Sequence, residues 1–351
     1  LLKELGITYS AIHLNEGHAA FALVERFRQK VELGLDPAEA WRHVKDTSLF
    51  TTHTPVAAGH DKFPHWMIDK YFSQYYGSIP MSREEFLHAG AHQEDPPEMF
   101  NMAAFSLRMS AYANGVSAKH GEVARRMWHF LWPEEKREEI PIGSITNGVH
   151  VPTWMNQRLI LLINRYLSQI CPDWLDHHDK EYVWALIDNI PDEKLWELHY
   201  GLKIKLINRI LQFKRRDWMK YQADCANVVA GGALIDPNTL TIGFARRFST
   251  YKRADLIFRD LDRIKKILNN QWQPVQIIFA GKAHPADDEG KRILQRIYQY
   301  AQQPEFGGRI AFVEDYGEQI AKYLVQGVDI WMNNPVPPLE ASGTSGMKAA
   351  V

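Results

Sequence analysis

The segment Thr239-Leu-Thr-Ile-Gly-Phe-Ala245 begins the pattern that decides the fold of this 351-residue chain. Three further short apolar runs follow it, at Val275–Ala280, Arg309–Val313 and Val328–Met332. Helical stretches separate the four runs, near residues 252–269, 290–302 and 317–326. Buried strands that alternate with helices are typical of an α/β protein with a parallel, doubly wound sheet.

The first half of the chain has strand and helix signals of its own. Residues 7–14 and 48–54 are rich in β-formers and predict strands, and residues 142–145 predict a short third one. Asn15 is expected to cap a helix that runs to about Glu32. Asp36-Pro-Ala-Glu39 is a favourable helix start, and residues 65–133 and 152–229 look mainly helical. A chain of this length suits two domains.

Composition narrows the class of protein. The net charge of −1 offers no argument for binding nucleic acid or an acidic membrane surface. We find no apolar stretch long enough to span a bilayer and no secretory signal, and Cys171 and Cys225 lie far apart, which favours a reducing, cytoplasmic location. Neither end of the sequence resembles a natural terminus, so we expect a fragment of a longer chain.

A basic segment follows the first apolar run. It contains four cations within eight residues, namely Arg246, Arg247, Lys252 and Arg253. Ligands of doubly wound sheets bind at the carboxyl ends of strands, where arginine offers phosphate a planar fork and lysine a point charge. The alternative is a solvated basic turn. Polar groups also follow the other predicted strands, at His13–His18, His53–Pro55, Gly281–Pro285, Glu314–Tyr316 and Asn333–Pro335.

The segment Glu340-Ala-Ser-Gly-Thr-Ser-Gly-Met-Lys348 combines a carboxylate, a run of small residues and a lysine. Small residues let backbone N–H groups approach an oxyanion, and a following helix would add a favourable field. Lys348 could bind phosphate or form an imine with an aldehyde. The alternative is a Ser/Gly-rich loop before a terminal helix.

Other chemistries find little support. His88 and His92 are four residues apart and could ligate a metal from one helix face, but no H-E-x-x-H motif or cysteine partner accompanies them, so we predict no metal. The G-x-S-x-G elbow of hydrolases and the phosphate loop of NTPases are missing from the sequence, and a carboxylate nucleophile is not evident.

Taken together, the motifs resemble those of the α-glucan phosphorylases, which act on glycogen, starch or maltodextrin. The resemblance covers nearly the whole chain and is closest to the compact prokaryotic branch. Besides residues 340–348, it rests on these segments: His13–His18, Thr51–Pro55 and its continuation to His60, Asn101–Ala103, Asn114–Val116, Thr146–Gly148, Arg246–Arg253 and Gly281–Ala283.

The resemblance implies two Rossmann-like domains that face each other across a cleft, the GT-B arrangement, here truncated at both ends. Residues 1–147 would be the C-terminal part of the first domain. Residues 148–351 would be the second, with a helical lead-in at 152–229 and a parallel sheet at 239–351.

The resemblance also implies roles for individual residues. Lys348 would hold pyridoxal 5′-phosphate as a Schiff base, with Tyr316 beside the ring. The cofactor phosphate would be bound by Thr344, the Ser345 backbone and Arg246, where the family usually has lysine. Arg247 and Lys252 would bind inorganic phosphate. Glucosyl hydroxyls would be bound by Glu340, Ser342, Gly343, Tyr251, Asn147 and His53, and the His53 carbonyl would lie near the anomeric carbon.

The implied reaction is retaining phosphorolysis of terminal α-1,4-glucosyl units to glucose 1-phosphate, with the cofactor's phosphate assisting proton transfer. The expected partners are α-glucan and inorganic phosphate, with no nucleic acid or membrane, and a homo-oligomer is left open. Two alternatives remain: a glycogen synthase-like GT-B transferase that uses a nucleotide sugar, and a non-catalytic glucan-binding fragment. The 351-residue piece alone is expected to be inactive.

Overall fold

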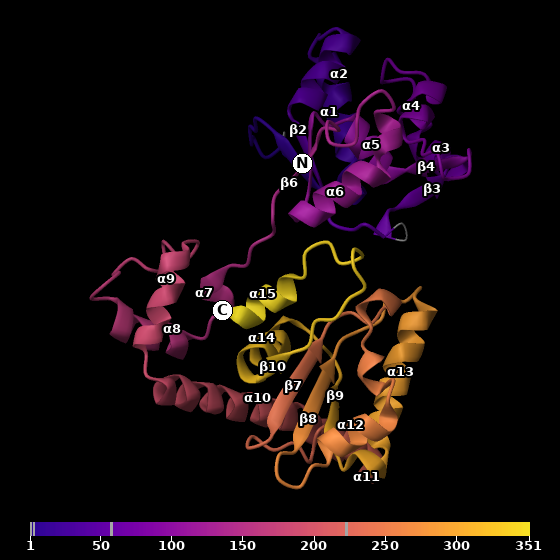
Figure 1. Cartoon of the computed structure of the whole chain (residues 1–351). Helices are drawn as coiled ribbons and strands as arrows, with labels where there is room; N and C mark the ends of the chain where they lie inside the picture. Colours follow the sequence, from indigo (N-terminus) through magenta and orange to yellow (C-terminus); the bar gives the residue numbers. More distant parts are fainter. Residues whose placement is uncertain (1, 3, 57–58, 222–223) are drawn as a thin grey trace. The chain divides into compact units, whose positions relative to one another are not determined.

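The computed structural model describes residues 2, 4–56, 59–221 and 224–351, with the backbone alone for 215–221. It divides into two compact units: Leu1–Asn147 with Pro337–Ser342, and Gly148–Val336 with Gly343–Val351 (Figure 1). Two predictions extend beyond the described residues, because the motif that continues to His60 includes Ala57 and Ala58, and the helical stretch at 152–229 includes Gln222 and Ala223.

The first unit is built on a four-stranded parallel sheet with the order β1-β2-β5-β6. Its strands are β1 (Ile12–Asn15), β2 (Ser48–Thr52), β5 (Tyr112–Gly115) and β6 (Ile142–Ser144). A small antiparallel pair is formed by β3 (Lys62–Pro64) and β4 (Met99–Asn101). The helices are η1 (Gly17–Ala19), α1 (Phe21–Glu32), α2 (Pro37–Asp46), α3 (His65–Phe72), α4 (Arg83–Ala89), α5 (Met102–Arg108), α6 (Ala118–Met127) and η3 (His129–Leu131).

Two predictions for this unit need correction. Asn15 does not cap the first helix: it ends β1, and α1 begins at Phe21 without a side-chain cap. The stretch 65–133, predicted as mainly helical, also contains β3, β4 and the interior strand β5. The sequence of β5, Tyr-Ala-Asn-Gly, has little intrinsic strand preference. It is a strand because it pairs with β2 on one side and β6 on the other.

The second unit contains the sheet predicted from its apolar runs. Its strands are β7 (Leu240–Ala245), β8 (Val275–Ala280), β9 (Ile310–Val313) and β10 (Ile330–Trp331), all parallel, in the order β10-β7-β8-β9. The helices that precede the sheet are α7 (Val151–Trp154), α8 (Gln157–Leu167), α9 (Glu181–Ala185), η4 (Leu186–Asn189), α10 (Asp192–Tyr221) and α11 (Cys225–Ala230).

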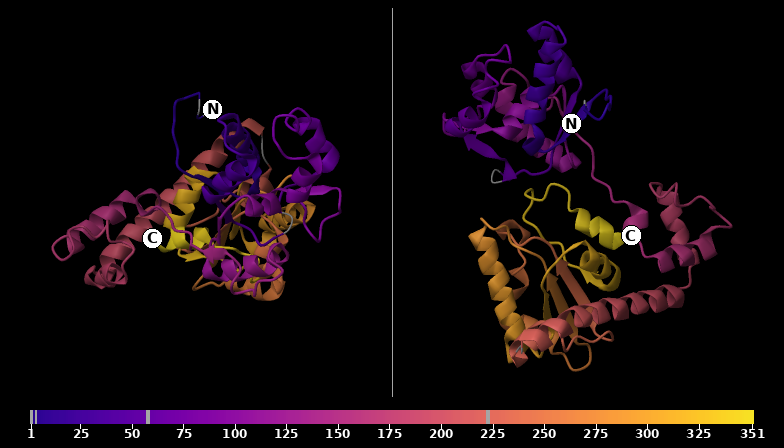
Figure 2. Two further views of the ribbon diagram at one scale, coloured as in Figure 1. Left: turned by 90° about the horizontal axis from the view of Figure 1, so that it is seen from above. Right: turned by 180° about the vertical axis from the view of Figure 1, so that it is seen from behind.

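Helices cover both faces of this sheet (Figure 2), as the doubly wound pattern requires. Alternate residues of β8 point to opposite sides: Ile277 and Phe279 pack with α12 (Leu261–Leu268) and α13 (Asp288–Gln302), whereas Ile278 packs with α10 and α14 (Glu318–Gly327). The stretch near 252–269 is less regular than predicted, because the turns η5 (Thr250–Lys252) and η6 (Leu256–Phe258) precede α12. The short helix η7 (Pro304–Phe306) precedes β9.

A buried ion-pair network ties α10 to the sheet. The Asp329 carboxylate, just before β10, accepts hydrogen bonds from His199 Nε2 at 2.8 Å and the Thr241 amide at 2.7 Å, and lies 2.6 Å from Lys203 Nζ. Burial opposes ionisation of Asp329, but these contacts outweigh it and lower its pKa to about 2. The network therefore holds β10 and β7 in register against α10.

In the described part of the chain, no helix combines the length and the apolar character that crossing a bilayer would require.

Candidate functional site

In the second unit, Arg246 directly follows β7 and lies close to the last helix. Its side chain is 6% exposed and donates a hydrogen bond to Asn333 Oδ1, beyond the end of β10. The Asn333 amide nitrogen lies 3.4 Å from the position that a Cβ on Gly346 would occupy. Gly346 belongs to α15 (Thr344–Ala350), so this cation lies near the first turns of the helix that carries Lys348.

Gly281 allows the loops after β7 and β8 to approach each other. Its φ is +148°, and a Cβ there would lie 2.0 Å from the Arg246 carbonyl oxygen. The Arg246 amide donates to the Ala280 carbonyl at 3.1 Å, and the Phe248 amide donates to the Lys282 carbonyl at 2.9 Å. The backbone of the basic segment is thus held beside the end of β8, which only glycine permits.

The rest of the basic segment is tied to the loop that follows β10. Arg253 has a left-handed backbone with φ 53°, and its guanidinium donates to the carbonyls of Asn334 at 2.7 Å and Pro335 at 3.1 Å. Lys252 is buried, with its ammonium 4.6 Å from the Tyr251 ring centroid. Only Arg247 among these cations is exposed, so the interpretation as a wholly solvated turn does not fit the segment.

Lys348 lies in a partly apolar setting. Its Nζ is 4.0 Å from the ring centroid of Trp154, at the end of α7. Burial lowers the pKa of the Lys348 ammonium, while the charge of Glu318 acts in the opposite direction. A lower pKa increases the neutral fraction of the amine, which is the form that attacks an aldehyde.

Two more of the predicted residues are held by hydrogen bonds in the same unit. The Tyr316 hydroxyl donates to the Ala245 carbonyl at 3.3 Å, at the end of β7, and burial raises the tyrosine pKa against the opposing charge of Arg246. The Ser345 hydroxyl accepts a bond from Trp331 Nε1 at 3.4 Å. Arg246, Tyr316 and Ser345 thus each contact a residue at or just beyond the end of β7 or β10.

These residues fit an anionic, aldehyde-bearing cofactor. Within the described part of the chain, the Ser249 hydroxyl and the Asn334 side-chain oxygen are buried without a hydrogen-bond partner. Buried polar groups normally have partners, so unsatisfied ones beside a basic loop are consistent with a polar ligand. Arg246 supplies positive charge and Lys348 supplies an amine of lowered pKa.

In the first unit, a polar cluster forms where β1 and β2 end. His53 Nε2 is hydrogen-bonded to the side-chain oxygen of Asn15, and the His53 amide donates to the Glu16 carboxylate. That carboxylate also accepts a bond from the Thr52 hydroxyl at 3.1 Å. Glu16 has φ 71°, a conformation that costs a non-glycine residue about 1 kcal/mol or more. The Glu16 contacts hold the backbone at His53.

A second group of polar contacts follows the neighbouring strand β5. The backbone amide of Asn147 donates to the Val116 carbonyl at 3.0 Å, which fixes the position of Asn147. The Val116 amide in turn lies 3.2 Å from Nδ1 of buried His120 and donates to it. The Ser117 hydroxyl donates to the Ala341 carbonyl at 2.6 Å. That bond attaches the segment with Glu340 and Ser342 to the start of α6.

The predicted motif at 340–348 is therefore shared between the two units. Glu340 and Ser342 belong with the first unit, while Gly343, Thr344 and Lys348 belong with the second. The domain prediction placed all of residues 148–351 in one domain, whereas the structure assigns Pro337–Ser342 to the other unit.

One sequence-based interpretation is wrong. His88 and His92 do not share a helix face, because α4 ends at Ala89, and His92 packs edge-on against Trp128 and Phe130 instead. The Glu314 carboxylate, which follows β9, lies 2.6 Å from Lys214 Nζ on α10. Among the described residues, no group of three or more histidine, cysteine or acidic side chains is arranged to hold a metal ion.

Trp154, which lies beside the Lys348 ammonium, was not among the site residues predicted from the sequence. No local signal marks it, because it precedes Lys348 by almost two hundred positions in the chain. Asn333 was recognised only as one of several polar groups after strands. Its hydrogen bond to Arg246 depends on the pairing of β10 with β7.

The His120 contact predicts a pH dependence of stability. Burial lowers the pKa of His120 to about 4, with the charge of His53 adding to the effect and a bond to the Thr54 backbone opposing it. The unfolded chain binds a proton near pH 6.5 and the folded one only near 4, so the free energy of unfolding should fall as the pH falls between these values. His120→Asn should reduce this fall in urea titrations at pH 7 and pH 5. An unchanged pH dependence would contradict the assignment.

The chain is similar to known carbohydrate phosphorylases over almost its full length. The family model described as carbohydrate phosphorylase matches residues 3–351. The chain is 47% identical over 351 residues to a glycogen phosphorylase of Aquifex aeolicus and 46% identical over 351 residues to a maltodextrin phosphorylase of Thermococcus litoralis, in both cases over 100% of this chain. A glycogen phosphorylase of Mycobacterium tuberculosis is 40% identical over 97% of this chain.

The chain spans about half the length of the curated relatives it matches, 50% for the Aquifex protein and 41% for the Thermococcus protein. The match nevertheless extends over the whole of the present sequence and includes both sheets and the segment with Lys348. The resemblance drawn from the motifs is confirmed: this chain belongs to the carbohydrate phosphorylase family.

Proposed function

We propose that this chain is part of an α-glucan phosphorylase that releases α-D-glucose 1-phosphate from the ends of glycogen, starch or maltodextrin with retention of configuration. The observation that carries the proposal is the placement of Lys348. Its amine has a lowered pKa, and the same helix lies beside Asn333 and, through it, the buried Arg246. The names of the relatives, glycogen and maltodextrin phosphorylase, support the substrate class.

The residues of the second unit would bind the cofactor and phosphate. Lys348 would hold pyridoxal 5′-phosphate, Arg246 with Thr344 and the Ser345 backbone would bind its phosphate, and Tyr316 would flank the ring. When bound, this cofactor supplies a phosphate group that can assist proton transfer. Arg247 and Lys252 would bind inorganic phosphate, and their positive charges would offset the repulsion between two nearby anions.

The remaining residues would orient the glucosyl unit. Glu340, Ser342, Gly343 and Tyr251 would bind its hydroxyls, with Asn147 and His53 on the same sugar. The Asn15 and Glu16 contacts hold His53 in one orientation, so its backbone carbonyl would face the anomeric carbon reproducibly. Bound phosphate would then donate its proton to the leaving glycosidic oxygen, which is general acid catalysis.

We further propose that the two units are halves of a GT-B arrangement. Residues 1–147 would be the C-terminal part of the first Rossmann-like domain and residues 148–351 the second. A four-stranded parallel sheet in each unit supports this proposal. A cytoplasmic location is likewise proposed, supported by the two free cysteines, Cys171 and Cys225.

The glycogen synthase-like alternative would use a nucleotide sugar and would have no use for an amine at Lys348. The two functions differ in a single assay of the complete protein: phosphate-dependent release of glucose 1-phosphate from maltodextrin, with and without pyridoxal phosphate. Release that needs both supports the phosphorylase. Transfer from a nucleotide sugar with no such release would refute it.

Replacing Arg247 by alanine tests the phosphate site. We expect kcat/KM for phosphate to fall roughly 30-fold or more, because a charge-assisted contact is lost. This corresponds to a loss of about 2 kcal/mol of transition-state stabilisation. Arg247→Lys should recover only part, since the planar fork is lost. Arg259→Ala, also an exposed arginine of this unit, is the control and should leave the kinetics unchanged. If Arg247→Ala weakens only maltodextrin affinity, the segment is a glucan contact instead.

A further inference from the structure

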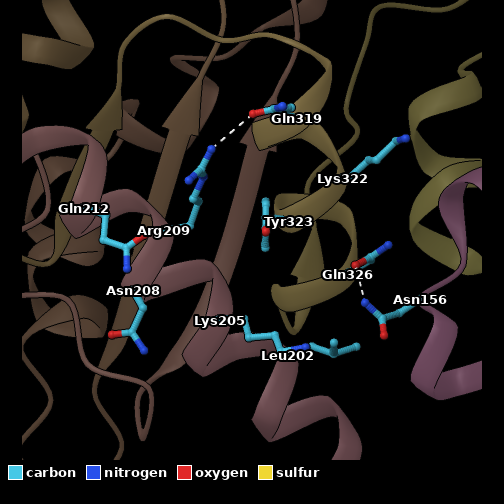
Figure 3. Close-up of a pocket in the computed structure, with 10 residues that line it drawn as sticks. All are labelled: Asn156, Leu202, Lys205, Asn208, Arg209, Gln212, Gln319, Lys322, Tyr323 and Gln326. Atoms are coloured by element: carbon cyan, nitrogen blue, oxygen red, sulfur yellow. Dashed lines mark hydrogen bonds between the residues drawn. The ribbon is translucent and has the colours of Figure 1, made fainter.

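The second unit has a hollow of about 650 Å³ along α10 and α14, on the sheet face opposite α12 and α13 (Figure 3). Among the described side chains that line it, three are cations, Lys205, Arg209 and Lys322, and none is a carboxylate. Most of the others are amides. This lining differs from that of an ordinary solvated helix face, where charges of both signs alternate.

Arg209 is the lining cation whose described contacts most favour binding of an anion. Its Nη2 donates to Gln319 Oε1 at 3.1 Å, and its guanidinium lies 4.4 Å from the Phe213 ring and 5.9 Å from the Tyr323 ring. All of these contacts are neutral. Its Nε is buried and has no hydrogen-bond partner among the described residues. A guanidinium held by rings on α10 and α14 thus retains donor capacity for a ligand.

The other two cations differ in their partners. Lys205 makes no ion pair with another described residue. Lys322 is paired with Glu318, whose carboxylate lies 3.4 Å away and is exposed and outside the hollow. The positive charge of Arg209 and Lys205 therefore favours an anion in the hollow, and the arginine fork matches a phosphate group.

Some amide side chains of the hollow are held by hydrogen bonds within the protein, and others are available to bind a ligand. Asn156 donates to Gln326 at 2.9 Å, and Gln326 donates to the Trp154 carbonyl at 2.7 Å, so these two are held in place. Asn208 and Gln212 also line the hollow, and their side chains form no hydrogen bond with any other residue that the structure describes. Each offers two N–H donors and one carbonyl acceptor, which suits sugar hydroxyls.

We propose that this hollow binds a phosphorylated sugar, with its phosphate on Arg209 and Lys205 and its hydroxyls on Asn208 and Gln212. A neutral glucan would gain nothing from the three cations, and free phosphate would leave most of the hollow unfilled. The hollow is formed by residues other than those assigned to phosphorolysis, so the proposal does not depend on that function.

A second hollow in the same unit provides a matched control. It has a volume of about 630 Å³ and contains Arg263 and Lys266, but Asp260 and Asp262 line it too. These carboxylates offset the cations, so no anion should bind there with useful affinity. Removing two positive charges from this hollow changes the net charge of the protein as much as removing Lys205 and Arg209.

Calorimetric titration of the complete protein with ribose 5-phosphate tests the proposal, with ribose and inorganic phosphate as comparison ligands. The double variant Lys205→Gln/Arg209→Gln should lose at least about tenfold in affinity for ribose 5-phosphate, as expected for a lost charged pair. Arg263→Gln/Lys266→Gln should retain the wild-type affinity. Ribose should bind far more weakly than its phosphate.

Gln319→Glu is a second variant that keeps Arg209 and its packing. It would place a carboxylate on the guanidinium, and the same loss of affinity is expected. An unchanged affinity in both the double variant and Gln319→Glu, or an equal loss in the Arg263/Lys266 control, would overturn the proposal. Ribose binding as tightly as ribose 5-phosphate would show a neutral sugar site instead, and inorganic phosphate binding as tightly would refute the sugar contacts.

Discussion

Replacing Lys348 by alanine should abolish retention of pyridoxal phosphate and reduce phosphorolysis by at least about a thousandfold, because the cofactor supplies the chemistry that side chains lack. The variant Lys348→Arg keeps a positive charge at this position but removes the primary amine, so it distinguishes the role of the charge from that of the amine. Arginine can keep the contact with the Trp154 ring, 4.0 Å away in the native protein, but it cannot form an imine. It should therefore lose the cofactor as completely as alanine does.

The attachment site itself can be mapped. Borohydride reduction of the complete protein followed by peptide analysis should place the pyridoxyl group on Lys348, and Lys282→Ala, a change at another strand end, should leave the labelling intact. Label on a different lysine would show that Lys348 has another role. Normal cofactor absorbance in Lys348→Ala would do the same.

Replacing Asp329 by asparagine should destabilise the second unit by about 3–5 kcal/mol, the usual effect of leaving one partner of a buried ion pair uncompensated. Lys203 is 3% exposed and lies 2.6 Å from the Asp329 carboxylate, so the variant leaves a buried ammonium without its counter-charge. Asp255→Asn is the control. It removes the partner of Arg296 in a much more exposed pair, where the loss should stay below about 1 kcal/mol.

The same network predicts an acid sensitivity. The pKa of Asp329 is lowered to about 2 in the folded chain, so its contribution is fully present above the ordinary aspartate pKa near 4 and disappears as the pH falls towards 2. Urea unfolding between pH 7 and pH 3 should show this loss in the wild type and a smaller one in Asp329→Asn. If both proteins have the same midpoint at pH 7, the network does not stabilise the unit.

The sheet of the second unit could be predicted because its signals are local. The run Val275–Ala280 is apolar except for Gln276, and the strand has the predicted bounds. The polar groups at Gly281–Pro285 and the basic segment after β7 could be predicted for the same reason, since doubly wound sheets present ligand groups at strand ends. Several such motifs occur in the same order along the chain as in the α-glucan phosphorylases, and this was enough to recognise the family.

Strand β5 and the position of Asn15 could not be predicted in the same way. Tyr112–Gly115 becomes a strand only because the neighbouring strands β2 and β6 supply its hydrogen bonds. Asn15 does not cap a helix because it is the last residue of β1 and its side chain is hydrogen-bonded to His53. Both outcomes depend on residues more than twenty-five positions away in the chain. Propensity within a short window contains no information about such partners.

The amino-acid sequence by itself determined the α/β class, the parallel sheet of the second unit, the family, and the residue types available for phosphate and an aldehyde. These properties follow from apolar periodicity and from motifs that are continuous in the chain. Only the tertiary structure decided that Lys348 lies against the Trp154 ring, that Asn333 accepts a hydrogen bond from Arg246, that Asp329 holds α10, and that Arg209 has no carboxylate partner among the described residues. Each of these depends on contacts between distant segments, which exist only once the helices have packed on the sheet.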